Sequence, residues 1–253
     1  MRILRWAERQ KTGASSVGIF IALATNTGTI SAEATGGEGS ARGLYNASAF
    51  DAITVNEGSI SAVADGTLAA YGQYEAVAFG AYNLAVYYDS IVDNSGFISA
   101  SASATTDISG TYGFLVAKAL GAVAVSMYGY GETAITNSNS ITASAETSQG
   151  YAGSWGAVSL AGVYGSASIE NEGLISTYSH TDIGSADTTG AYVKSIAGTS
   201  SLVNHGDISA NARSERGIVN VTVNYADATG VQLLAPYGSG EATLANYGRI
   251  EAN

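Results

Sequence analysis

The segment Val55-Asn56-Glu57-Gly58-Ser59-Ile60-Ser61-Ala62 carries a pattern that recurs along the whole chain. An Asn is followed in most repeats by a Gly at the second position after it, an Ile at the fourth and an Ala at the sixth. The seven repeats are marked by Asn26, Asn56, Asn94, Asn137, Asn171, Asn204 and Asn246. A motif that is constant while the spacing between its copies varies predicts a repeat architecture with loops of variable length.

Positions counted from each Asn show a period of two, which is the period of a β-strand and not of a helix. The fourth position after the Asn is Ile in all seven repeats: Ile30, Ile60, Ile98, Ile141, Ile175, Ile208 and Ile250. The even positions are therefore expected to face the core. The Asn belongs to this buried face, where stacked Asn side chains can satisfy one another's amide groups in a ladder.

The second position after the Asn is expected to form a tight corner between two strands. It is occupied by Gly28, Gly58, Gly96, Gly173, Gly206 and Gly248, with Asn139 in the fourth repeat. Because Gly and Asn both tolerate positive φ, the pattern predicts a left-handed turn residue at this position.

A second element lies between the motifs, where a Gly is followed by an apolar residue. We aligned it on Gly18, Gly43, Gly80, Gly113, Gly156, Gly190 and Gly230. In this alignment the next outward position holds an aromatic residue in four repeats, namely Phe20, Tyr45, Tyr82 and Tyr192. Aromatic residues in one outward row predict a contact surface for neighbouring molecules or glycans.

One repeat cannot bury a core alone, whereas stacked repeats align Asn on Asn and Ile on Ile. We therefore predict an all-β fold, a parallel β-helix (β-solenoid) of about seven coils, as one domain over residues 17–253. Residues 1–16 are a basic segment, which we interpret as an assembly arm or a signal-like region. Its basic residues are Arg2, Arg5, Arg9 and Lys11.

Two copies of the motif, at 55–62 and 169–176, are separated by Gly-apolar-Tyr segments. Such copies resemble the repeats in passenger domains of bacterial autotransporter adhesins and related large surface proteins. The resemblance covers nearly the whole chain. It implies a right-handed β-helix at the bacterial cell surface or outside the cell, and it carries over no catalytic residue.

Composition excludes several classes of function. The formal net charge is -11 and four of the ten basic residues lie in the first eleven positions, so the rest of the chain repels nucleic acid. The absence of Cys excludes disulfides and thiolate metal sites. No apolar run approaches the eighteen residues of a membrane span. We predict no cofactor, and no cofactor-binding or metal-binding residue.

Candidate catalytic residues are few. His180 lies in the string Ser179-His180-Thr181-Asp182, but neighbours in a strand face opposite sides, so this string cannot itself form a triad. The outward acids are spread over different repeats: Glu57, Asp93, Glu170, Glu172 and Asp207. Hydrolysis of a glycan requires carboxylates gathered in one cleft. No catalytic residue is predicted.

The sequence thus favours a non-enzymatic extracellular structural protein, a subunit of a head-to-tail filament or surface fibre that binds copies of itself. The alternatives are an adhesin passenger fragment that binds glycans or cell surfaces and, less favoured, a polysaccharide-active β-helix enzyme. The ends of the repeat array show no polar capping element. This pattern is typical both of a subunit that stacks and of a slice of a longer repeat protein.

Overall fold

The computed structural model describes residues 9–36, 39–68, 73–106, 114–128, 130–216, 225–236 and 241–253. Within these ranges all regular elements are β-strands, and the strands pair in parallel, which confirms the prediction of an all-β, parallel fold. The arrangement is consistent with a parallel β-helix or solenoid. No helix within the described residues is long and apolar enough to cross a membrane.

Short strands, each ending at the Asn of a repeat, form a seven-stranded sheet. They are β2 (Ile21–Asn26), β5 (Asp51–Asn56), β8 (Ser90–Asn94), β11 (Thr133–Asn137), β13 (Ala167–Asn171), β15 (Ser200–Asn204) and β18 (Ala242–Asn246). Their register places Asn opposite Asn in every pair, from Asn26 and Asn56 to Asn204 and Asn246.

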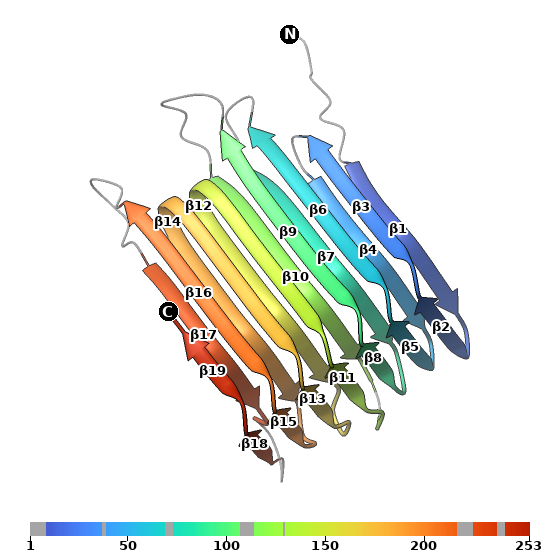
Figure 1. Ribbon diagram of the computed structural model, residues 1–253. Coiled ribbons are helices and arrows are strands. Elements are labelled where there is room, and N and C mark those ends of the chain that lie inside the picture. The colour runs from blue at the N-terminus through green and yellow to red at the C-terminus, as the bar shows by residue number, and fades with distance from the viewer. Residues whose placement is uncertain are drawn as a thin grey trace.

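The other strands form a twelve-stranded sheet. They are β1 (Arg9–Gly18), β3 (Thr29–Gly36), β4 (Gly39–Ser48), β6 (Ser59–Leu68), β7 (Gln73–Ala85), β9 (Phe97–Thr106), β10 (Phe114–Ser126), β12 (Ser140–Ala161), β14 (Leu174–Ser195), β16 (Asp207–Arg216), β17 (Tyr225–Leu234) and β19 (Arg249–Ala252). Figure 1 shows these long strands in two layers, with the short strands at one end of both layers.

The two layers belong to one sheet because β12 and β14 run through both. The first half of β12 pairs with β9 and the second half, from Gly150, pairs with β10. Gly150 has φ +119° and its neighbour Gly184 in β14 has φ +134°. Only Gly adopts these angles without strain, so the two glycines allow the continuous strands to bend from one layer into the other.

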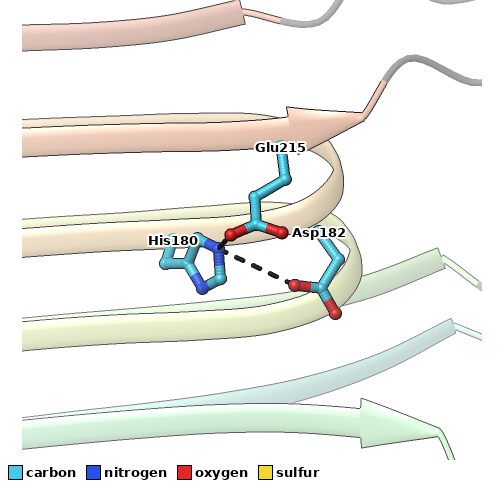
Figure 2. A group of neighbouring side chains, drawn as sticks. All are labelled: His180, Asp182 and Glu215. Atoms are coloured by element: carbon cyan, nitrogen blue, oxygen red, sulfur yellow. Dashed lines mark ion pairs between the residues drawn. The ribbon is translucent and has the colours of Figure 1, made fainter.

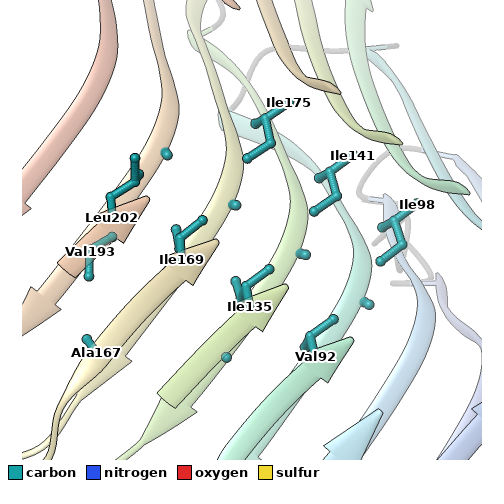
Figure 3. Packing of buried hydrophobic residues seen from close by; sticks show 14 of the residues in the cluster. Val92, Ile98, Ile135, Ile141, Ala167, Ile169, Ile175, Val193 and Leu202 are labelled. Carbon is teal, nitrogen blue, oxygen red and sulfur yellow. The ribbon is translucent and has the colours of Figure 1, made fainter. Parts of the chain in front are cut away.

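Glycines lie across the core from the Ile row. A Cβ atom added to Gly43 would lie 2.6 Å from Ile60 Cγ2, and one added to Gly121 would lie 2.5 Å from Ile141 Cγ2. The whole row consists of Gly13, Gly43, Gly80, Gly121, Gly156, Gly190 and Gly230. Figure 3 shows the Ile residues in their own row, opposite aliphatic side chains of the short sheet.

Two of the glycines on which we aligned the second element are therefore wrong. The register pairs Ala14 with Leu44 and Ala122 with Ala81, so the glycines of this row are Gly13 and Gly121 where the alignment used Gly18 and Gly113. Gly113 itself lies outside the described residues. Away from the Ile row the core is lined mainly by alanines. Such small side chains let the two layers lie close together.

The Asn residues form a continuous ladder that is buried from Asn26 to Asn204 and exposed at Asn246. The amide of each Asn donates to Oδ1 of the Asn in the next repeat, at 2.7 to 2.8 Å in all six steps. The amide also donates to a backbone carbonyl of the next repeat, as from Asn137 to Leu174 O at 3.1 Å. The ladder thus links the short sheet to the strand that follows each corner.

The corner glycines do not have the predicted positive φ; among the described glycines only Gly36, Gly150 and Gly184 do. Their position excludes a side chain for another reason: a Cβ atom on Gly58 would clash with the carbonyl oxygen of Gly28 in the preceding repeat. Asn139 shows the effect, since Ser140 N lies 3.3 Å from Gly96 O, against 2.7 to 2.9 Å at the other corners. Close stacking of repeats, and not a left-handed turn, selects Gly.

Candidate functional site

The edge of the stack at β1, β2 and β3 exposes apolar side chains. In the described part of the chain these strands pair on one side only, with β4, β5 and β6. The exposed side chains, between 60 and 76% accessible, are Val17, Ile19, Phe20, Ile21 and Leu23. Leu23 lies in register with Ile53, which is half-buried because it has a neighbour on both sides. A further layer on this edge would cover Leu23 in the same way.

The opposite edge is formed by β17, β18 and β19, which pair only with β14, β15 and β16 in the described residues. Leu244 and Tyr247 are exposed there. The Tyr247 ring stacks on His205 of the preceding repeat, with ring centroids 4.8 Å apart. The Tyr247 side chain is 73% exposed.

The hydrogen-bonding groups of the two edges are complementary. Between inner repeats, Glu57 N and Gly58 N donate to Asn26 O at 2.8 and 3.1 Å, while the Asn amides donate in the opposite direction along the ladder. At the first edge Gly28 N instead bonds to Oδ1 of its own Asn26, at 3.1 Å. At the last edge Asn246 Nδ2 keeps the bond to its own Gly248 O, at 3.1 Å, that inner Asn residues such as Asn204 also make, but within the described residues it has no following Asn to donate to. The first edge thus presents backbone N–H groups and Asn26 Oδ1. The last edge presents backbone carbonyls and the Asn246 amide, which can pair with them.

The aromatic row predicted from the sequence is only partly formed. Tyr45 and Tyr82 are in register and stack with centroids 5.8 Å apart, and Tyr192 lies in the same row beyond two valines. Phe20 lies elsewhere, at the β1–β2 corner, where it stacks on Phe50 at 5.4 Å. Phe50 in turn stacks on Tyr88, so the corner carries an aromatic run that the alignment on Gly18 missed.

A shallow recess of about 310 Å³ lies on the outer face of the layer formed by β10, β12 and β14. It is lined by Lys118, Leu120, Trp155, Val158 and Tyr192. The lining combines two aromatic rings with one cationic group. Rings of this kind provide flat apolar surfaces on which a ligand can stack.

An acidic group lies on the same face. Asp187 accepts a hydrogen bond from the Tyr151 hydroxyl at 3.3 Å and is in register with Asp227. Burial, and next the charge of Asp227, raise the pKa of the Asp187 carboxyl above its ordinary value. Burial and the nearby Asp187 raise the pKa of Tyr151 as well. The outward acids from the sequence analysis, Glu57, Asp93, Glu170, Glu172 and Asp207, are all exposed and lie at the corners or strand ends.

The predicted basic assembly residues lie partly in the first strand. Strand β1 begins at Arg9 and pairs with β4, and Lys11 is exposed on it. Arg2 and Arg5 lie outside the described residues. Residues 9–16 of the basic segment thus belong to the sheet.

One group of possible metal ligands converges within the described residues: His180, Asp182 and Glu215 (Figure 2). From the sequence, His180 was not expected to form a triad within its own string. The partner that was missed, Glu215, comes from the next repeat. Asp182 and Glu215 both lie eleven residues after the Asn of their repeat, at Asn171 and Asn204, and this equal spacing was the available signal.

No family model, curated protein or solved structure matches the chain. The edges, the aromatic recess and the His180 group therefore rest on their own geometry. Of these, the two edges involve the largest part of the fold, because every row of the stack in the described residues reaches them.

Proposed function

We propose that the chain is a right-handed parallel β-helix of about seven coils that joins head to tail into a non-enzymatic extracellular filament or surface fibre. The coil number follows from the seven motifs, and the handedness from the resemblance to autotransporter passenger repeats. That resemblance also supports a location at the bacterial cell surface or outside the cell. The partner in this proposal is a second molecule of the same chain.

The complementarity of the two edges carries the proposal. A second molecule placed against the first edge would present Asn246 Nδ2 to Asn26 Oδ1, repeating the ladder bond of every inner step. The same contact would present the carbonyls of Asn246 and Gly248 to the corner N–H groups of the first repeat. A contact between two different surfaces that does not close on itself builds a filament.

Apolar burial supports the same contact. Each large apolar side chain contributes roughly 1.5 to 3 kcal/mol when it is fully buried. Five such side chains are exposed at the first edge. Because the inner counterpart of Leu23, Ile53, is half-buried, stacking gains about half of this amount for each side chain, or about 4 to 8 kcal/mol in all, which lies in the lower part of the roughly 4 to 15 kcal/mol that association costs in lost freedom of motion. The backbone bonds then supply direction and register.

The test replaces Thr29 by Pro. In later repeats the equivalent N–H donates to the preceding corner, as from Ser59 N to Gly28 O at 2.7 Å, so Thr29 N faces the open edge. Proline removes this donor and is tolerated on edge strands. We expect fibres of the wild-type chain in electron micrographs, none from T29P, and normal fibres from the matched control Thr29→Ser. A wild-type chain that stays monomeric in sedimentation at high concentration would overturn the proposal, as would unchanged fibres of T29P.

The recess at Trp155 favours the adhesin as the second candidate. A sugar ring could stack on Trp155 and Tyr192, and an acidic substituent would compete with Glu75 for Lys118, whose Nζ lies 2.8 Å from Glu75 Oε1. In this case Trp155→Ala should abolish retention on immobilised acidic glycans and leave fibre formation intact. Turnover in a glycan-cleavage screen that Asp187→Asn abolishes would instead support an enzyme.

A further inference from the structure

The His180 group is built on two neighbouring strands. His180 and Asp182 alternate with the buried Ser179 and Thr181, so both point outward from β14. Glu215 lies on β16, which pairs with β14 in fixed register. Figure 2 shows the three side chains turned toward one another. Because the two strands are paired, the backbone positions of the three residues are fixed before any ion binds, and only the side chains have to adjust.

The distances suit a small ion. His180 Nε2 lies 3.5 Å from Glu215 Oε1 and 3.7 Å from Asp182 Oδ1, and all three ligand atoms lie within 4.8 Å of one another. A tetrahedral ion with bonds of about 2.0 to 2.2 Å separates its ligand atoms by roughly 3.3 to 3.6 Å. The two carboxylates are half-exposed and can close the remaining gap by small rotations.

The imidazole nitrogen lacks a hydrogen-bond partner. Nε2 of His180 is inaccessible to solvent, yet no donor or acceptor lies within hydrogen-bonding geometry. Charge-assisted hydrogen bonds between nitrogen and carboxylate are about 2.7 to 2.9 Å long, clearly shorter than the two distances here. Buried polar atoms without a hydrogen-bond partner are rare, and a bound ion between the nitrogen and the two carboxylates would satisfy Nε2.

The ligand set selects the class of ion. Imidazole nitrogen favours Zn²⁺ and related transition metals, whereas Ca²⁺ and Mg²⁺ take oxygen ligands. Three protein ligands leave a further position, and the exposed side of the group is open to water. Glu146 of β12, in register with His180, adds negative charge nearby. The competing cation is Arg213, whose Nη2 lies 3.1 Å from the same Glu215 oxygen.

We propose that His180, Asp182 and Glu215 bind one divalent transition-metal ion of the Zn²⁺ class. The ion joins β14 to β16 and so links two successive repeats through their side chains. This site is separate from the first edge of the stack and from the recess at Trp155. It borders the last edge, because β16 pairs with β19 only as far as Ala210 and Glu215 lies beyond that point. It does not depend on filament formation.

The test uses untagged full-length chain freed of metal with a chelator. Isothermal titration with ZnCl₂ should show one ion per chain, and MgCl₂ and CaCl₂ should not compete. His180→Gln and Glu215→Gln should each weaken Zn²⁺ binding more than about tenfold, which is the loss typical even for residues that only support a ligand. Circular dichroism of both variants should match the wild type.

The matched control is His205→Gln. His205 is the other histidine of the chain, is exposed at a corner, and contacts Tyr247 instead of a carboxylate. Its replacement should leave the affinity and the stoichiometry unchanged. Absence of Zn²⁺ binding by the wild-type chain, or equal affinity of H180Q and wild type, would overturn the site. Cobalt substitution gives a second readout, because Co²⁺ bound in this group should produce a visible absorption band that H180Q lacks.

Discussion

Replacement of Asn137 by Ala removes the centre of the Asn ladder. The side chain is fully buried, accepts from Asn94 Nδ2 at 2.8 Å, and donates to Asn171 Oδ1 at 2.7 Å and to Leu174 O at 3.1 Å. Three hydrogen bonds are lost at about 1 kcal/mol each, and Asn171 Oδ1 is left buried without its donor at about 1 to 3 kcal/mol. Partial overlap of these terms gives an expected loss of about 3 to 5 kcal/mol in the free energy of unfolding.

The matched variant is Asn246→Ala at the last edge of the stack. Asn246 accepts from Asn204 at 2.7 Å but is exposed, so water can replace the bonds that its side chain makes. We expect a loss of about 1 kcal/mol. Urea denaturation followed by circular dichroism measures both variants at concentrations too low for fibres. Equal losses for the two variants, or a loss below about 1 kcal/mol for N137A, would refute the assignment of the ladder as a main stabilising element.

Three further predictions concern the corners, the acidic face and the metal group. Gly58→Ala should lower stability by about 1 to 3 kcal/mol because its Cβ meets Gly28 O, whereas Gly28→Ala, with nothing within 4 Å, should stay within about 0.5 kcal/mol; equal losses in thermal melts would restore the positive-φ explanation. Since the pKa of Asp187 is raised, the folded state holds its proton more tightly than the unfolded state, and the carboxylate costs stability above that pKa. Asp187→Asn should therefore raise the melting temperature at pH 7, with the gain disappearing below the ordinary pKa range of Asp, and a lower melting temperature at pH 7 would contradict the shift. Arg213→Gln should tighten Zn²⁺ binding, because it frees the Glu215 oxygen; weaker binding in the titration would show that Arg213 supports the group instead of competing with the ion.

The rows that repeat without exception were readable from the sequence. Asn and Ile recur at fixed positions in all seven repeats, and the structure stacks them in register. The second element was harder, because 32 glycines and variable loops offer several alignments. Gly13 and Gly121 are recognised only when the facing residue, Ile30 or Ile141, is known.

The reason for the corner glycines could not be read from sequence alone. Positive φ and close stacking both select Gly, and only the backbone geometry separates them. Thr54 is similar: it interrupts a row of aliphatics, yet in the fold it donates to Asn83 Oδ1 at 2.6 Å in a second buried polar group. The His180 group depends on a contact between repeats, so its carboxylates become a pair only after the register is fixed.

The alanine-lined interior between the long layers sets how this fold can change in size. In a globular domain the fraction of the chain's surface that is buried on folding rises with size, because volume increases faster than surface. Here the interior is lined mainly by small alanine side chains, which fix the cross-section. An added repeat buries the same area as the one before it. Stability per residue is therefore nearly independent of the number of repeats. Evolution or a protein engineer can vary the length of such a rod freely, but its thickness hardly at all.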